Sequence, residues 1–210
     1  MRWFAGFALY AAALGAGVWW AGAAGRTDVK DLLSFTLVVS CACQFVPIPI
    51  IPLFLWIARA WNPFLVALVG SAATSVANLH DYYILTALLR WDRIGKAKEA
   101  AWYRRAAAWF GRYPFWTLAV ANVLPLPVDV PRLLAISTRY SRPRFVLATL
   151  VGRYPRYLFL SVVGYELQLT NLQILVVLIA TVAIAGIKTL HSRLRQKSKT
   201  GGAAPLGETQ

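Results

Sequence analysis

The sequence predicts an all-α integral membrane protein with about four transmembrane helices and two inverted re-entrant helical hairpins. Its 210 residues are 59% hydrophobic, and the mean hydropathy of +0.55 exceeds what a soluble domain of this size would bury. Four apolar stretches are long enough for a membrane helix, which takes about 20 residues. Two further apolar stretches are interrupted by prolines near their middles, and these are the predicted hairpins.

The predicted transmembrane helices cover roughly residues 3–24, 64–89, 144–165 and 172–190. Residues 1–24 also fit a secretory signal, with Arg2 as the basic start and small residues at 21–24 as a cleavage site. The apolar core of roughly 20 residues is longer than that of a usual signal, which favours a retained helix. We expect one membrane domain over residues 1–190 and a disordered polar tail over residues 191–210.

The predicted hairpins lie near residues 33–60 and 114–141 and carry matching prolines. The residues at the breaks are Pro47, Pro49 and Pro52 in the first hairpin and Pro125, Pro127 and Pro131 in the second. A bilayer tolerates a broken helix only where protein or water satisfies the freed backbone groups, which favours a re-entrant hairpin. A pair of kinked transmembrane helices is the alternative, because membrane prolines often only bend a helix.

The same landmarks follow each set of prolines in the same order. They are Arg59, Pro63, Phe64 and Gly70 in the first copy, and Arg139, Pro143, Phe145 and Gly152 in the second. The offset between the copies grows only from 78 residues at the first proline to 82 residues at the glycine. The repeat halves, about 33–90 and 114–165, indicate an inverted-repeat transporter whose substrate site lies where the broken helices meet. Arg59 and Arg139 are expected to anchor the chain at the membrane interface.

Basic residues outnumber acidic ones by 22 to 8, and their placement predicts the orientation of the chain. Lysines and arginines concentrate in residues 90–112 and 188–199, and the positive-inside rule assigns both segments to the cytoplasm. Both termini are then cytoplasmic, the first hairpin enters from outside and the second enters from inside. The pattern favours membrane orientation and anionic head groups over nucleic acid as the reason for the charge. Aromatic and basic residues within 91–113 predict an interfacial helix, with an ordinary loop as the alternative.

Charged residues at membrane depth mark the candidate site, because each costs about 2.5–3.5 kcal/mol to insert. Asp129 and Arg132 lie in the second hairpin, three residues apart, close enough to pair or to flank a polar cavity. Arg153 and Arg156 lie about 14–18 Å into the third span, with Pro155 between them weakening the helix. Two arginines one turn apart are suited to hold a phosphate by charge and forked hydrogen bonds.

Other acidic residues leave a structural alternative open. Asp129, Asp81 or Glu166 would neutralise the arginines in an internal ion-pair network that has no substrate. His80 stands next to Asp81 in the second span, and this pair is a candidate proton relay. A polar lining of the cavity is an equal alternative for the two residues.

We expect no enzyme activity, no cofactor and no metal. His80 and His191 have no serine or cysteine partner at a recognisable spacing, so bond-breaking catalysis is not implied. Cys41 and Cys43 have no third cysteine and no nearby histidine, which favours small apolar packing residues over metal ligands.

The order of these motifs resembles the DedA superfamily, whose shared region is the VTT or SNARE-associated domain. The hairpin prolines carry the resemblance together with Asp129, Arg132 and the glycine-bearing stretches 152–156 and 164–165. The resemblance extends from about Leu32 to about Tyr165. It implies two inverted re-entrant hairpins that face each other and a role in moving lipids between leaflets. Bacterial members are linked to undecaprenyl phosphate recycling or phospholipid transport, and eukaryotic relatives resemble scramblases.

The chain departs from the family pattern at one site in each hairpin. Ile51 and Pro52 stand where many relatives carry a glutamate just after the prolines. Asn122 stands where the second hairpin usually has an arginine ahead of its proline. The proton coupling thought to matter for some members is therefore not implied for this chain.

The sequence favours a translocase of a lipid or lipid phosphate, either a phospholipid or undecaprenyl phosphate, in a bacterial cytoplasmic (inner) membrane. Arg132, Arg153 and Arg156 would meet the phosphate while the acyl or prenyl chain stays in lipid. A proton- or ion-coupled secondary transporter of a small solute is the first alternative, and a non-transporting membrane scaffold is the second. The expected partners are membrane lipids with anionic head groups, nucleic acid is not expected, and a homo-oligomer stays open.

Overall fold

The computed structural model describes residues 2–42, 48–88, 108, 110–123, 129–138 and 140–183. The chain divides into two compact units, residues 1–169 and residues 170–210, and each is described by itself. Every regular element in the described part is a helix, which confirms the predicted all-α class. The single membrane domain over residues 1–190 stays a prediction.

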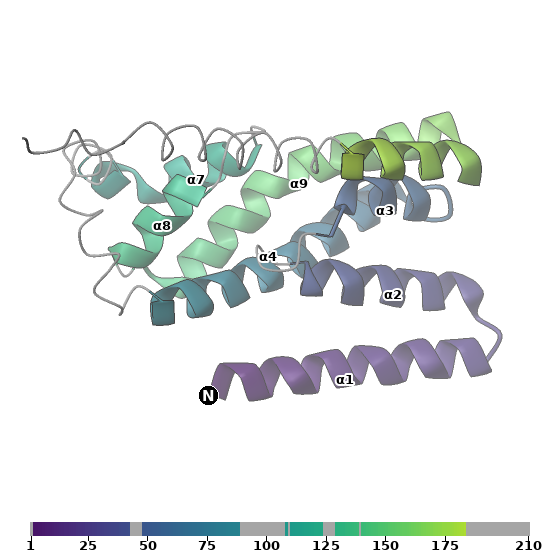
Figure 1. Cartoon of the computed structure of the whole chain (residues 1–210), viewed down its shortest axis with the longest axis horizontal. Coiled ribbons are helices and arrows are strands. Elements are labelled where there is room, and N and C mark those ends of the chain that lie inside the picture. The colour runs from purple at the N-terminus through teal and green to yellow at the C-terminus, as the bar shows by residue number, and fades with distance from the viewer. Residues whose placement is uncertain are drawn as a thin grey trace, which may run out of the picture. The chain divides into compact units, whose positions relative to one another are not determined.

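Figure 1 labels the helices of the first unit in chain order. They are α1 (Arg2–Ala23), α2 (Thr27–Cys41), α3 (Ile50–Ile57), α4 (Pro63–Leu88), α7 (Pro114–Val123), α8 (Asp129–Ser137) and α9 (Arg142–Leu167). The helices α1, α4 and α9 coincide with the first three predicted spans. Two segments of the described part, Trp3–Ala23 and Pro63–Ala87, have the length and apolarity of a membrane span. The number of spans and the re-entrant course of the hairpins stay predictions.

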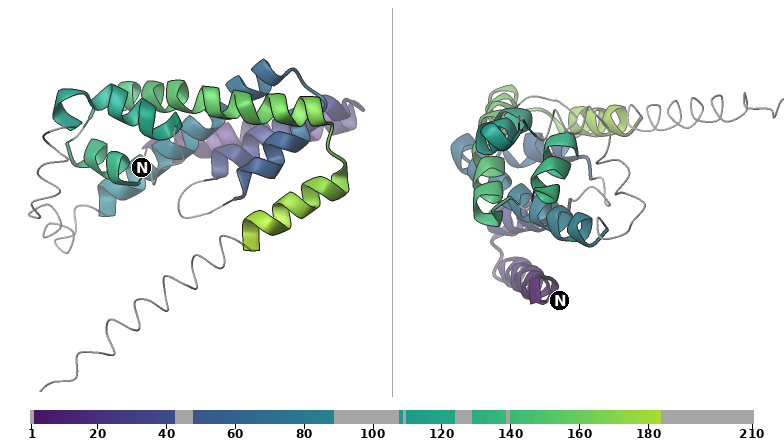
Figure 2. Two further views of the ribbon diagram at one scale, coloured as in Figure 1. Left: turned by 90° about the horizontal axis from the view of Figure 1, so that it is seen from above. Right: turned by 90° about the vertical axis from the view of Figure 1, so that its left-hand side faces the viewer.

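A tight turn joins α1 to α2 and sets the two helices side by side (Figures 1 and 2). Gly25 has a φ of +70°, which glycine adopts without steric cost. The Arg26 N–H donates to the Ala21 carbonyl oxygen at 2.9 Å, which satisfies a free carbonyl at the end of α1. The helix α2 then starts at Thr27, earlier than the predicted start near residue 33.

The helices α4 and α9 form an antiparallel pair at the centre of the first unit. The Tyr82 ring near the end of α4 lies 5.3 Å from the Phe145 ring near the start of α9. The helix α4 begins with Pro63, and the Asn62 Oδ1 accepts the Phe64 N–H at 2.9 Å, so a cap and a preset φ start this helix. The helix α9 continues through Pro155.

Each hairpin break is followed by a short helix whose third residue is a proline. These residues are Pro52 in α3 and Pro131 in α8. The first turn of a helix tolerates a residue without an N–H, because that group has no partner within the helix. Pro49 is the N-cap residue of α3. The other predicted break residues, Pro47, Pro125 and Pro127, lie outside the described residues.

In both halves of the predicted repeat, the short helices pack on the long helices α4 and α9 in the same pattern (Figure 1). In the first half α2 lies against α4 and α3 lies against α9; in the second half α7 lies against α9 and α8 lies against α4. Each hairpin therefore places its first arm on the long helix of its own half and its second arm on the long helix of the other half. Figure 2 shows α7 and α3 along different parts of α9.

In the second unit the structure describes the helix Asn171–Ala183, which overlaps the first part of the fourth predicted span. A reciprocal cap starts it: the Thr170 N–H donates to the Gln173 Oε1 at 2.8 Å, and the Gln173 N–H donates to the Thr170 Oγ1 at 3.4 Å. Arg139, Cys43, His191, the polar tail and most of the predicted interfacial helix lie outside the described residues.

Candidate functional site

A buried ion pair joins α8 to α4. Arg132 donates from Nη1 to the Asp81 Oδ2 at 2.7 Å and from Nη2 to the Asn78 Oδ1 at 2.9 Å. The side chains of Arg132 and Asp81 are 8% and 2% exposed, so water does not screen either charge. Asp81 therefore offsets the charge of Arg132. The side chain of Asp129 lies outside the described part of the chain.

The polar residues of α4 share one buried face, because they recur every three or four residues. They are Ser71, Thr74, Ser75, Asn78 and Asp81. The serine hydroxyls donate to carbonyl oxygens one turn back, at 2.6 Å for Ser71 and 2.8 Å for Ser75. Thr74, Asn78 and Asp81 contact side chains of other helices, which is how polar side chains join membrane helices.

Neutral groups hold the Arg153 side chain between α7 and its own helix. The Arg153 Nε donates to the Asn122 Oδ1 at 3.0 Å, and Nη1 donates to the Tyr157 hydroxyl at 2.9 Å. Asn122 is 3% exposed, and its Nδ2 donates to the Leu118 carbonyl oxygen at 2.8 Å. That bond directs the amide oxygen toward Arg153. Neither partner carries a negative charge, so neither offsets the charge of the guanidinium.

Tyr157 connects Arg153 to α4. The Tyr157 and Thr74 hydroxyl oxygens are 3.1 Å apart, and the Thr74 hydroxyl lies 2.6 Å from the Gly70 carbonyl oxygen. A carbonyl only accepts and Thr74 has one hydroxyl hydrogen, so Tyr157 donates to Thr74 while it accepts from Arg153. The Tyr157 ring also stacks on Phe54 of α3, with centroids 4.2 Å apart. Contacts from α7, α9 and α4 thus determine the position of Arg153.

Arg156 lies one turn beyond Arg153 and is half-buried. Within the described residues it has no hydrogen-bond or ion-pair partner. The helix α9 has 26 residues and begins at Arg142; its length is about 39 Å, and both arginines lie about 16–21 Å from its start. Arg153 and Arg156, called the arginine pair below, therefore lie near the middle of the helix, where the sequence places them.

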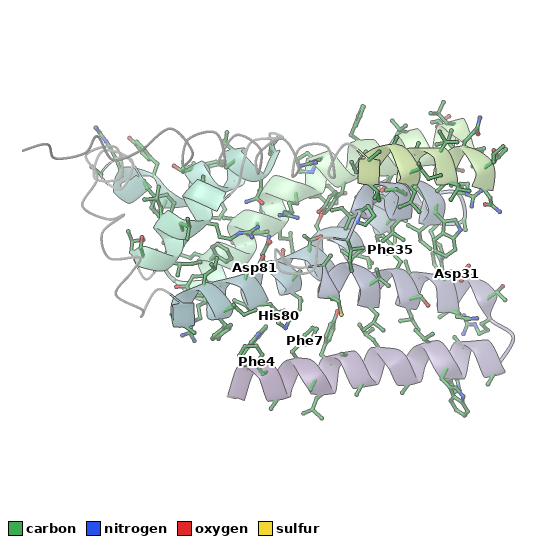
Figure 3. The ribbon with its side chains drawn as sticks, viewed as in Figure 1. Phe4, Phe7, Asp31, Phe35, His80 and Asp81 are labelled. Atoms are coloured by element: carbon green, nitrogen blue, oxygen red, sulfur yellow. The ribbon has the colours of Figure 1, made fainter. Side chains whose placement is uncertain are left out.

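His80 and Asp81 lie on opposite sides of α4 although they are adjacent in sequence (Figure 3). The His80 Nδ1 donates to the Val76 carbonyl oxygen at 3.0 Å, and the ring lies edge-on to Phe7 of α1, with centroids 3.8 Å apart. With Nδ1 protonated, Nε2 is the acceptor of the neutral ring, and it is buried with no partner among the described residues. Asp81 faces Arg132 of α8 instead. The proton relay stays a prediction.

Sequence reasoning identifies the arginines but misses two residues that position them. Tyr157 follows Arg153 by four residues, and this helical spacing is a signal that could have found it. Asn122 lies 31 residues from Arg153, so no local pattern predicts their contact. The sequence marks Asn122 only as a departure from the family pattern.

An all-helical chain with apolar outer faces and charged side chains buried between its helices belongs to the class of helical membrane proteins. Residues 34–166, more than half of the chain, match the VTT domain family. The chain is therefore a member of the VTT domain (DedA) family, which confirms the resemblance. The matched region contains most of the first predicted hairpin, all of the second, the Arg132–Asp81 ion pair and the arginine pair. No curated protein and no solved structure matched the chain.

Proposed function

We propose that the protein moves a lipid with a phosphate head group between the leaflets of a bacterial inner membrane. One observation carries the proposal: the arginine pair lies in the middle of α9 with no carboxylate partner within the described residues. A charged arginine costs about 2.5–3.5 kcal/mol at the bilayer centre. An anion that visits the site offsets this cost, and a phosphate matches the forked donors of guanidinium groups.

The proposal divides the charged residues into two layers with separate roles. In one layer Arg132 and Asp81 neutralise each other and join α8 to α4. In the other layer the arginine pair keeps its positive charge for the substrate. The layers are separated along α4 by the seven residues from Thr74 to Asp81, which is about 10 Å. Arg132 and Asp129 then organise the site, and Arg153 and Arg156 contact the phosphate.

The surface of α9 supports a lipid rather than a soluble anion as the substrate. On α9, the helix that carries the half-buried Arg156, the side chains of Val151 and Phe159 are 43% and 68% exposed. A head group at the arginine pair would leave its acyl or prenyl chain along this apolar face, in lipid. The proposed reaction is movement without bond cleavage, so the protein acts as a translocase and not as an enzyme.

Leaflet exchange in proteoliposomes tests this function. A fluorescent phospholipid and a fluorescent polyprenyl phosphate are placed in both leaflets, and a membrane-impermeant quencher reports exchange with and without a proton gradient. We expect the protein to accelerate exchange of at least one probe over empty liposomes, and the faster probe names the substrate class. If neither probe exchanges faster than in empty liposomes under any gradient, lipid translocation is excluded.

A second candidate function is proton- or ion-coupled transport of a small solute. The burial of Asp81, which is 1% exposed, favours it, because an intramembrane carboxylate is a common element of proton and cation pathways. This candidate predicts gradient-dependent uptake of a solute in the same proteoliposomes without any exchange of lipid between leaflets.

A further inference from the structure

We propose that Asn122 determines the affinity of the arginine pair for its anion, because it orients Arg153 without neutralising it. The inference rests on the proposed function and assigns a role to a residue outside the arginine pair. Asn122 does not contact the substrate in this account. It is a positioning residue that acts through the guanidinium of Arg153.

Two of the N–H donors of Arg153 are used by neighbouring side chains, and others are left for a ligand. A guanidinium has five N–H groups, and Asn122 and Tyr157 accept from Nε and Nη1. Within the described residues Nη2 has no hydrogen-bond partner. The two neutral partners therefore fix the plane of the guanidinium and leave Nη2 for a ligand.

Arg132, which is buried in the same unit, has partners of a different charge. The described partners of Arg132 include one amide and one carboxylate, from Asn78 and Asp81. Arg153 is held by one amide and one phenol. An aspartate at position 122 would give Arg153 the same kind of neutralised environment that Arg132 has. At a separation near 3 Å, and on a side chain that is itself buried, that carboxylate would compete strongly with a phosphate for Arg153.

The helices α7 and α9 approach each other closely at the same position. A Cβ atom on Gly152 would lie 2.8 Å from the Asn122 Cβ and would overlap the Ala119 carbonyl oxygen. The glycine next to Arg153 therefore lets the short amide of Asn122 reach the Nε of this arginine. The hydrogen bond between Asn122 and Arg153 therefore depends on Gly152 as well as on the two residues that form it.

Isosteric replacement tests the inference on the purified full-length protein in detergent. Short-chain phosphatidic acid and phosphatidylcholine with the same acyl chains are titrated while the melting temperature is recorded. We expect phosphatidic acid to stabilise the native protein more than phosphatidylcholine does. We expect Asn122→Asp to weaken the binding of phosphatidic acid by at least about tenfold, because the variant loses roughly one charge-assisted interaction with the lipid. Asn62→Asp is the matched control, because aspartate caps a helix as well as asparagine does, and it should keep the preference.

Each outcome decides between the inference and the proposed function. If Asn122→Asp binds phosphatidic acid as tightly as the native protein, the role of Asn122 is refuted and lipid translocation is unaffected. If Asn122→Asp loses the preference and Asn62→Asp keeps it, the role of Asn122 stands even when the native protein exchanges no lipid between leaflets. A native protein without a preference for phosphatidic acid, or an equal loss in both variants, overturns the inference. Should Asn122→Asp fail to fold, Asn122→Ala decides, because unchanged binding there also refutes an orienting role.

Discussion

At the scale of single residues, the environments of Arg132 and Arg153 differ in whether a described partner supplies negative charge. Arg132 meets Asp81, whereas Arg153 meets the neutral groups of Asn122 and Tyr157. The first arrangement stabilises the packing of α8 on α4, and the second keeps a positive charge for a ligand. Removing one member of a buried ion pair is costly, because the other charge stays buried without compensation.

Asp81→Asn should therefore lower the free energy of unfolding by about 3–5 kcal/mol. Thermal unfolding of the purified protein in detergent measures this change. Asp28→Asn is the control, because Asp28 is exposed and its loss should stay within about 0.5 kcal/mol. Equal stability of the Asp81 variant and the native protein would show that Arg132 does not depend on this carboxylate.

The sequence predicts which charged residues matter but not how they pair. Arginines inside apolar stretches are conspicuous, because membrane insertion penalises them. The pairing of Arg132 with Asp81 spans 51 residues and depends on how α8 packs on α4, which no local spacing encodes. Asp129 is the nearer acidic residue in sequence, and for that reason the sequence names it first.

At the scale of elements, two glycines in equivalent positions of the repeat set the approach of neighbouring helices. A Cβ on Gly70 of α4 would overlap the Phe54 ring of α3, and a Cβ on Gly152 of α9 would overlap a backbone carbonyl of α7. An aromatic ring is able to shift, but a backbone carbonyl moves only with its helix. Gly152 is therefore the less replaceable of the two, in line with the small residues that bring membrane helices together.

Gly152→Ala should destabilise the protein by about 1–3 kcal/mol, the usual cost of overpacking a filled interior. Gly6→Ala is the matched control, because a Cβ there meets nothing within 4 Å and alanine favours the helix by up to about 1 kcal/mol. Melting temperatures of the two variants in the same detergent give the comparison. If Gly152→Ala melts with or above Gly6→Ala, the close contact of α7 with α9 is absent.

The elements themselves are largely predictable from the sequence, and their ends are less so. Apolar length predicts the positions of α1, α4 and α9, and the prolines predict where α3 and α8 begin. The sequence does not predict that α2 starts as early as Thr27. The prediction uses apolar length, and the first turns of α2 contain charged residues that an apolar stretch does not include. The packing of each hairpin on both long helices depends on contacts distant in sequence.

At the scale of the whole molecule, the distribution of basic residues and the VTT domain match together favour an inverted arrangement in the membrane. Arg112 belongs to the basic segment assigned to the cytoplasm, and Asp28 belongs to the nearly neutral segment after the first span. The proposed orientation therefore places these two residues on opposite sides of the bilayer.

Single cysteines report this orientation directly. In a background with Cys41→Ser and Cys43→Ser, a membrane-impermeant maleimide should label Asp28→Cys in intact cells. The same reagent should label Arg112→Cys only after the membrane is permeabilised. Labelling of both positions in intact cells, or the reverse pattern, would refute cytoplasmic termini.

The most direct measurement of the central claim is the rate of lipid exchange in proteoliposomes that contain Arg153→Ala/Arg156→Ala at the same folded yield as the native protein. The control is Arg112→Ala/Arg144→Ala, which removes the same charge from exposed positions. We predict at least about a tenfold loss of exchange in the first variant, since each lost charge-assisted contact is worth about 1.5–3 kcal/mol, and near-native exchange in the control. Native exchange rates in the Arg153→Ala/Arg156→Ala variant would contradict an arginine-lined path for the phosphate head group.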